Sequence, residues 1–141
     1  MSEAFDSSND DCRLVKLPRI HNRAGNITAL NQRGELPFSP ERIYYLYDVP
    51  GGESRGGHAH KSLHQYLIAG SGSFDVVLHD GKKEQRYHLS RGYYGLYVPK
   101  LVWRSMENFS TNSLALICSN ITYDSNDYIR DRNAFTELTH E

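Results

Sequence analysis

The sequence is poor in cysteine, in long apolar runs and in targeting features. Its 141 residues include only Cys12 and Cys118, and two cysteines so far apart in sequence are typical of free thiols in a reducing compartment. The longest apolar run is residues 114–118, whereas a membrane-spanning helix needs about 20 residues. Residues 1–11 are polar and acidic and lack the basic patch and apolar stretch of a secretory signal. We therefore expect a cytoplasmic protein with no membrane partner.

No charge of one sign dominates the sequence either. The 16 basic and 17 acidic side chains give a formal net charge of −1, whereas proteins that hold a nucleic-acid backbone usually carry a large basic excess. We therefore expect no nucleic acid as a partner. With 38% hydrophobic and 23% charged residues, the chain is neither collagen-like nor fully disordered. Its length fits one domain, so we predict a frayed end over residues 1–11 and a single domain over residues 12–141.

Short strand-like runs make up most of the remaining sequence. Gly, Pro, Asn or Asp separates them, and Asp80-Gly81 between two runs predicts a hairpin because both residues tolerate positive φ. This spacing predicts an all-β sandwich or barrel. Near the end of the chain, residues 124–127 can cap a helix that extends through Phe135. The expected strands lie within residues 14–17, 27–30, 42–48, 64–69, 73–79, 85–89, 94–98, 102–109 and 114–122.

The densest group of chemically capable side chains lies in residues 55–65, RGGHAHKSLHQ. Side chains alternate along a strand, so His58 and His60 are expected to point to the same side. Two neighbouring imidazoles suit either metal binding or proton transfer, since a neutral ring nitrogen can do both. The alternative is that each histidine is a surface group or a satisfied core group. The glycine-rich loop and Arg55 before the pair favour the functional interpretation.

The spacing of these residues resembles the signatures of the cupin superfamily. The first signature corresponds to Gly52, His58, His60, Gln65 and Gly72, although glutamate normally stands at the Gln65 position. The second runs from Pro99 to Asn108, where Leu101 replaces the usual glycine and Arg104 the usual histidine. The resemblance implies a jelly-roll barrel, and a short carboxyl-terminal helix completes the predicted all-β fold.

The departures from these signatures argue against a metal ion. A guanidinium has no lone pair to donate and repels a divalent cation, so Arg104 cannot serve as a ligand. Two imidazoles and the weak amide oxygen of Gln65 fall short of the usual three protein ligands of a catalytic metal site. His64 remains a possible third ligand. We therefore predict no metal and no cofactor, and a pocket suited to an anion beside Arg55 and Arg104.

Five blocks in order make the resemblance more specific. They are similar to the dTDP-4-keto-6-deoxy-glucose 3,4-ketoisomerases, which are cupin-type enzymes of deoxyamino-sugar biosynthesis. This implies an isomerase without metal, a dTDP-linked 4-keto-6-deoxy sugar as substrate, and a homodimer that exchanges N-terminal strands. At residues 125–126, Ser-Asn replaces the usual Glu-Thr, and family members carry either histidine or arginine at position 104. The blocks are residues 42–45, 55–61, 95–98, 102–104 and 123–130.

The resemblance also assigns roles to residues. It implies His60 as the principal acid/base and His58 as its partner in relaying protons between sugar oxygens. Tyr45 and Arg104 are candidates to hold the oxygens of the enediolate, because preorganised donors stabilise such charge. Arg55 can grip phosphate oxygens in a bidentate manner. The residues expected to bind substrate are Arg55, Arg104, Tyr44, His64 and Tyr97.

Several alternatives remain open at this point. A nucleotide-sugar 3,5-epimerase has the same fold but pairs its base with an aspartate, and no acidic residue adjoins His58 or His60 in sequence. A non-catalytic cupin module that binds sugar is the second alternative. Strand alternation allows only one face of residues 42–48 to point inward, so Tyr44 and Tyr45 cannot both be catalytic. The gluco or galacto configuration of the product at C4 is also open, and Arg104 resembles the gluco-forming relatives.

Overall fold

Two antiparallel five-stranded sheets form the body of the molecule. The computed structural model describes residues 12–32 and 34–139, so the predicted frayed end at residues 1–11 lies outside the described residues. The first sheet has the order β1-β9-β6-β11-β4 and the second the order β12-β5-β10-β7-β8. The first comprises β1 (Arg13–Lys16), β4 (Arg42–Tyr47), β6 (Gln65–Ser71), β9 (Tyr94–Val98) and β11 (Leu114–Ser119). The second comprises β5 (Arg55–His60), β7 (Phe74–His79), β8 (Glu84–Leu89), β10 (Trp103–Glu107) and β12 (Tyr128–Ile129).

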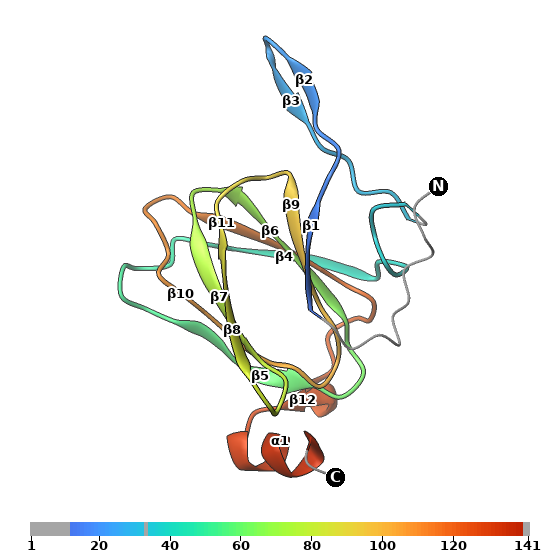
Figure 1. Cartoon of the computed structure of the whole chain (residues 1–141), viewed down its shortest axis with the longest axis vertical. Helices are drawn as coiled ribbons and strands as arrows, with labels where there is room; N and C mark the ends of the chain where they lie inside the picture. Colours follow the sequence, from blue (N-terminus) through green and yellow to red (C-terminus); the bar gives the residue numbers. More distant parts are fainter. Residues whose placement is uncertain (1–11, 33, 140–141) are drawn as a thin grey trace.

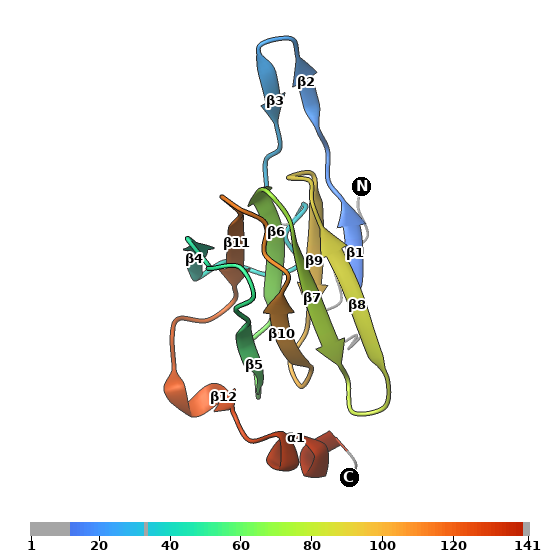
Figure 2. The same cartoon turned by 90° about the vertical axis from the view of Figure 1, so that its left-hand side faces the viewer.

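From β4 onward the chain passes between the two sheets at almost every connection. Strands β4, β6, β9 and β11 belong to one sheet and β5, β7, β8, β10 and β12 to the other, and Figure 2 shows the two layers. Within one sheet, neighbouring strands are therefore mostly not consecutive in sequence, as in double-sheet jelly rolls. The predicted all-β jelly roll is confirmed.

The main core lies between the inner faces of the sheets. Alternation along β7 directs Phe74, Val76 and Leu78 inward, and all three are almost completely buried. Facing residues such as Leu67 and Ile117 come from the first sheet and belong to the same cluster. Burying each large apolar side chain contributes about 1.5–3 kcal/mol, so this layer fixes which faces of the strands point inward.

The hairpin predicted at Asp80 is confirmed. Strands β7 and β8 pair from Phe74 with Leu89 to His79 with Glu84, and Gly81 has a positive φ of 99°. The Asp80 side chain accepts hydrogen bonds from the backbone N–H groups of Lys82 and Lys83 at 2.8 and 3.0 Å. The aspartate therefore closes the turn by satisfying backbone donors that the ladder leaves free.

The carboxyl-terminal helix begins later than predicted. Asp124 caps only the 3-10 turn η1 (Ser125–Asp127), and Tyr128–Ile129 then pair with β5. Helix α1 spans Arg132–Thr139, and its Phe135 packs on Trp103. Long-range pairing with the edge of β5 overrides the local helical periodicity, because it buries Ile129 and satisfies the backbone. No helix among the described residues has the length and apolar character needed to cross a bilayer.

A narrow arm extends from the opposite end of the body. It consists of β2 (Ile20–Asn22) and β3 (Gly25–Ile27), which pair with each other and form a separate two-stranded sheet. Figures 1 and 2 both show the arm projecting beyond the two larger sheets. Ile20 and Ile27 are 63% and 62% exposed. A two-stranded hairpin of this size is marginally stable by itself in water.

Candidate active site

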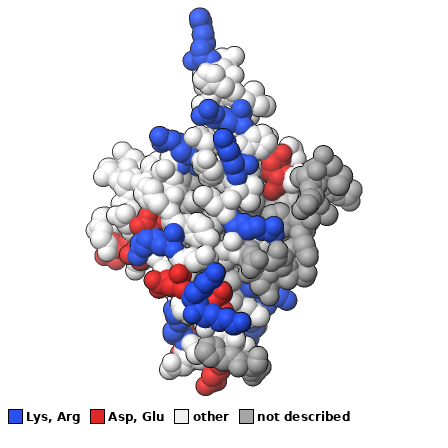
Figure 3. All heavy atoms as spheres, viewed as in Figure 1, with Lys and Arg blue, Asp and Glu red and all other residues white. Residues whose placement is uncertain are grey.

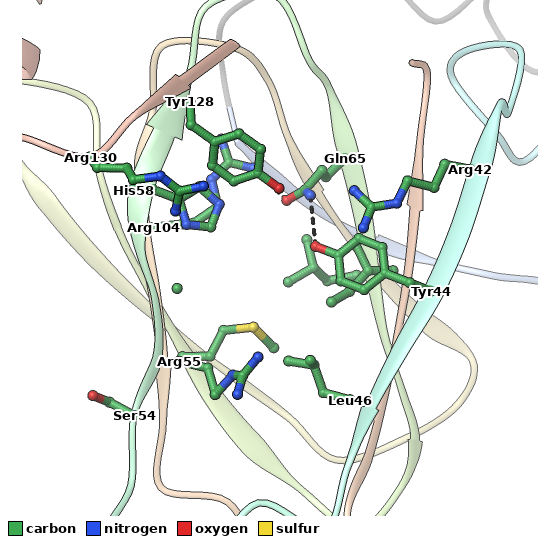
Figure 4. Close-up of a pocket in the computed structure, with 14 residues that line it drawn as sticks. Arg42, Tyr44, Leu46, Ser54, Arg55, His58, Gln65, Arg104, Tyr128 and Arg130 are labelled. Carbon is green, nitrogen blue, oxygen red and sulfur yellow. Dashed lines mark hydrogen bonds between the residues drawn. The ribbon is translucent and has the colours of Figure 1, made fainter. Parts of the chain in front are cut away.

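A cavity of about 530 Å³ opens between the two sheets. Figure 4 shows Tyr44 and Tyr128 approaching Gln65 from opposite sides of this cavity. Four arginines line it, and none of the described lining residues is acidic. Basic and acidic side chains are interspersed over the face of the body seen in Figure 3, so the positive charge of the cavity is a local feature. The lining residues are Arg42, Tyr44, Leu46, Ser54, Arg55, Gly56, His58, Gln65, Leu67, Arg104, Met106, Ile117, Tyr128 and Arg130.

His58 is the imidazole that lines the cavity. Strand β5 holds it opposite Arg104 of β10, and its Nε2 has no hydrogen-bond partner among the described residues. Burial, and then the nearby Arg104 charge, lower the pKa of His58 to about 4, while a hydrogen bond with the Gly56 backbone opposes the shift. The ring is therefore neutral near pH 7 and can accept a proton.

His60 lies behind His58 and is completely buried. The two ring centroids are 4.8 Å apart in an edge-to-face arrangement, which confirms that the rings share one side of β5. Burial, followed by Arg104 and His58, lowers the pKa of His60 to about 2. Its Nδ1 is 3.3 Å from Oδ2 of Asp127, although the geometry is not that of an aligned hydrogen bond. His60 therefore touches an acidic side chain that is remote in sequence.

Two of the three departures from the cupin signatures, Gln65 and Arg104, are hydrogen-bonded to each other. Arg104 donates from Nη1 to Oε1 of Gln65 at 2.6 Å, and Nε2 of Gln65 donates to the Tyr44 hydroxyl at 3.1 Å. The other terminal nitrogen of Arg104 donates to the carbonyl oxygens of Pro99 and Val102. Arginine can only donate, which fixes the orientation of the amide. The Tyr44 hydroxyl therefore accepts from Gln65 and has its own proton available for another acceptor.

This arrangement is unfavourable to a metal ion in the cavity. The Gln65 oxygen already accepts from Arg104, and the buried guanidinium would repel a divalent ion. Within residues 12–32 and 34–139, no group of three or more His, Cys, Asp or Glu side chains is arranged to hold a metal. That the protein acts without a metal ion, as the sequence implies, stays a prediction.

Three of the predicted site residues lie away from the cavity. Tyr45 is 57% exposed, because the alternation of β4 turns it to the outer face while Tyr44 points inward. His64 and Tyr97 are hydrogen-bonded to each other at 2.9 Å. Gln65, next to His64, points into the cavity, and Leu96, next to Tyr97, points into the core. His64 and Tyr97 therefore lie on the outer face of the first sheet. The structure does not support assigning these three residues to the cavity.

Three charged or aromatic lining residues, Arg42, Tyr128 and Arg130, were missing from the predicted site. The Arg42 guanidinium lies 4.3 Å from the centre of the Tyr44 ring, and that of Arg130 lies 4.2 Å from the centre of the Tyr128 ring. The Tyr128 ring is 4.8 Å from His58 and 4.4 Å from His60. Alternation from Tyr44 could have identified Arg42. Tyr128 and Arg130 belong to the last sequence block, but only the pairing of Tyr128–Ile129 with β5 brings this block to the histidines.

Comparisons with known proteins identify the family of the chain. The family model described as FdtA: WxcM-like, C-terminal, matches residues 10–140. The TDP-4-oxo-6-deoxy-alpha-D-glucose-3,4-oxoisomerase of Aneurinibacillus thermoaerophilus is 37% identical over 123 residues, which cover 87% of this chain and 88% of that protein.

Two solved structures are also similar over nearly the whole chain. The WlaRB TDP-quinovose 3,4-ketoisomerase of Campylobacter jejuni is 39% identical with a TM-score of 0.87, covering 90% of this chain and 98% of that one. A mutant of the 3,4-ketoisomerase QdtA from Thermoanaerobacterium thermosaccharolyticum, in complex with TDP-4-keto-6-deoxyglucose, is 32% identical with a TM-score of 0.89. It covers 91% of this chain and 93% of that one. From the extent and identity of these matches, the chain belongs to the FdtA, WxcM-like C-terminal family, and its resemblance to the sugar 3,4-ketoisomerases is confirmed.

Proposed function

We propose that this protein is an isomerase that moves the carbonyl group of dTDP-4-keto-6-deoxy-glucose from C4 to C3. The observation that carries the proposal is the pair of adjacent imidazoles, with ring centroids 4.8 Å apart, of which His58 lines a cavity that four arginines also line. Similar proteins are named as 3,4-ketoisomerases of TDP-linked sugars. The His58 imidazole is neutral near pH 7 and so can accept a proton next to a ketone, and the fixed positive charge beside it would stabilise the enediolate that forms.

Fixed positive charge at the cavity supports a diphosphate-linked substrate. Arg55 and Arg130 line the cavity and are exposed, so their guanidinium groups are free to grip phosphate oxygens in a bidentate manner. Arg104, in contrast, is buried and donates to Gln65 and to two backbone carbonyls. We assign Arg55 and Arg130 to the diphosphate, and Arg104 to the end of the cavity where the sugar reacts.

For the two histidines we propose the reverse of the roles that the family resemblance implies. His58 lines the cavity and has an unpartnered Nε2, so we assign it as the base that takes the proton from C3. Loss of this proton gives an enediolate, and return of a proton to C4 while O3 loses its proton gives the 3-keto sugar. We assign the transfer between the two oxygens to the pair of His58 and His60. Positioned proton transfer contributes about 10²–10⁴-fold to a rate.

Tyr44 takes the role expected of Tyr45. Its hydroxyl accepts a hydrogen bond from Gln65, which leaves its proton free to be donated to the oxyanion that develops on O4. Burial raises the pKa of Tyr44, so the phenol keeps this proton near pH 7. The donor is fixed before the substrate arrives, because Arg104 orients Gln65 and Gln65 orients Tyr44. Preorganised donors of this kind contribute about 3–4 kcal/mol to the stability of a transition state.

Incubation of the protein with dTDP-4-keto-6-deoxy-glucose, followed by NMR of the sugar, tests the proposal. The expected product has its carbonyl at C3. One observation favours a 3,5-epimerase as the second candidate, namely the contact between His60 and Asp127, since epimerases of this fold pair a histidine with an aspartate. A product inverted at C3 or C5, with the carbonyl still at C4, would establish the epimerase, and binding without turnover would establish a sugar-binding module.

The exposed arm supports a homodimer with exchanged N-terminal strands. The two exposed isoleucines of β2 and β3 lie on an arm that extends beyond the body, and packing on a second copy would bury them. Light scattering coupled to gel filtration should give twice the mass of the chain, and deletion of residues 20–27 should shift the mass toward one chain. A wild-type monomer would overturn this part of the proposal.

We also propose that the isomerase needs no metal, so exhaustive chelation should leave its activity unchanged. Loss of activity on chelation, restored by one added metal, would overturn that expectation.

A further inference from the structure

Asp127 is a nearly buried carboxylate that contacts both the turn after β5 and the His60 ring. It lies in the turn η1 and is only 7% exposed. Its Oδ1 accepts from the backbone N–H of Ser62 at 2.9 Å and from the Ser62 hydroxyl at 2.6 Å. Its Oδ2 accepts from the backbone N–H of Leu63 at 3.1 Å. These bonds tie η1 to the turn between β5 and β6.

The same Oδ2 atom lies 3.3 Å from Nδ1 of His60. The other charged groups acting on His60 are cationic, namely Arg104, Arg130 and Arg42. The remaining close neighbours are the neutral rings of His58 and Tyr128. Among the described residues, Asp127 is therefore the carboxylate in contact with this buried imidazole. A proton added to His60 would have no other negatively charged partner among the described residues.

Anchoring the turn explains three of these contacts but not the fourth. Hydrogen bonds to Ser62 and Leu63 would be satisfied with the His60 ring facing either way. The contact at Nδ1, however, bears on which ring nitrogen carries the proton. A carboxylate beside one nitrogen of a histidine favours the tautomer with its proton there, and it stabilises the imidazolium that forms when the other nitrogen is protonated.

We propose that Asp127 is a positioning residue for the isomerisation, because it holds the proton of His60 on Nδ1 and so keeps Nε2 free to accept one. When Nε2 accepts a proton during the relay, the N–H at Nδ1 donates to Oδ2 of Asp127, and the carboxylate itself stays unprotonated. Return of the proton from Nε2 to a sugar oxygen through His58, the imidazole that lines the cavity, restores the starting state. This inference depends on the relay role proposed for His60.

Kinetics of two matched variants separate positioning from anchoring. Asp127→Asn removes the charge that faces His60, whereas Ser62→Ala removes a hydrogen bond to Asp127 and leaves the contact with His60 intact. We expect Asp127→Asn to lower kcat about 10²–10⁴-fold, the range that positioned proton transfer contributes, with little change in KM. Ser62→Ala should keep the wild-type kcat and only lower the melting temperature. Equal kcat values in the two variants would assign Asp127 to anchoring alone.

The tautomer of His60 in the wild-type protein gives a test that needs no activity. We expect nitrogen-15 NMR to show His60 protonated at Nδ1 and unprotonated at Nε2, with the signal assigned by its absence in His60→Gln. This result holds even if Asp127→Asn fails to fold. A wild-type His60 protonated at Nε2 would overturn the inference. A His60→Gln variant with wild-type kcat would instead overturn the relay role, so the two failures are distinguishable.

Discussion

The inner and outer faces of the first sheet carry similar residues in opposite environments. On the inner face, Tyr44 and Gln65 form a hydrogen-bonded chain that starts at Arg104. On the outer face, Tyr45 is exposed, and His64 is bonded to Tyr97. Tyr44 and Tyr45 are adjacent in sequence, and so are Gln65 and His64. The difference shows that side-chain parity along a strand, and not residue type, decides which tyrosine or polar residue reaches the cavity.

The largest expected loss of kcat follows from substitution of the histidine that faces the cavity. His58→Asn removes the base that lines the cavity, so we expect kcat to fall about 10²–10⁴-fold with the fold intact. His64→Gln, on the outer face, should keep kcat near that of the wild type even if it lowers the melting temperature. Steady-state kinetics and circular dichroism check both variants. Similar losses of kcat in the two would show that facing the cavity does not separate their roles.

The adjacent tyrosines give the next largest effect. Tyr44→Phe removes the donor proposed for the enediolate, and losing one such donor costs about 10²–10³-fold in kcat. Tyr45→Phe changes a hydroxyl on the exposed face and should have no measurable effect on turnover. A larger loss for Tyr45→Phe would mean that the outer face of β4 contributes to catalysis.

Sequence patterns identified the histidines but could not choose between the tyrosines. The spacing of His58 and His60 fixes their common side whatever the phase of the strand. Residues 43–47, in contrast, are all apolar or aromatic, so the phase of β4 has no hydrophobic alternation to reveal it. Only packing against the core decides that Tyr44 points inward.

Long-range pairing accounts for the rest of what the sequence did not reveal. Gln65 and Arg104 could each be recognised as departures from the cupin signatures, but their mutual hydrogen bond requires the two sheets to be in place. Asp127 and Tyr128 reach His60 because β12 pairs with β5, a strand more than 60 residues earlier. Local periodicity predicted a helix across this segment, and it carries no information about such contacts.

The arginines of the cavity should separate binding from chemistry. Arg55→Gln removes a guanidinium proposed to hold the diphosphate, and since a charged hydrogen bond contributes about 1.5–3 kcal/mol, we expect KM to rise about 10–100-fold with little change in kcat. Arg104→His should alter the configuration of the product at C4 more than it alters KM. NMR of the product and initial-rate kinetics check the pair. An unchanged product together with a raised KM for Arg104→His would place Arg104 at the nucleotide instead.

The smallest expected effect is the pH dependence of the wild-type enzyme. Burial and Arg104 lower the pKa of His58 to about 4, and a base must be neutral to act. Activity is therefore retained as the pH falls from 7 and is lost only as it passes through about 4. A solvated histidine with a pKa near 6.5 would instead leave about a tenth of the activity at pH 5.5. The profile of kcat/KM against pH checks this, and a midpoint near 6.5 would mean that the base is not buried.

Exchange of the sugar C3 hydrogen in deuterated buffer, followed by NMR, tests most directly whether the imidazole at the cavity moves this proton. The account predicts that the wild-type protein exchanges this hydrogen while forming the 3-keto sugar, and that folded His58→Asn does neither. A folded His58→Asn variant that exchanges the C3 hydrogen at the wild-type rate would contradict the account.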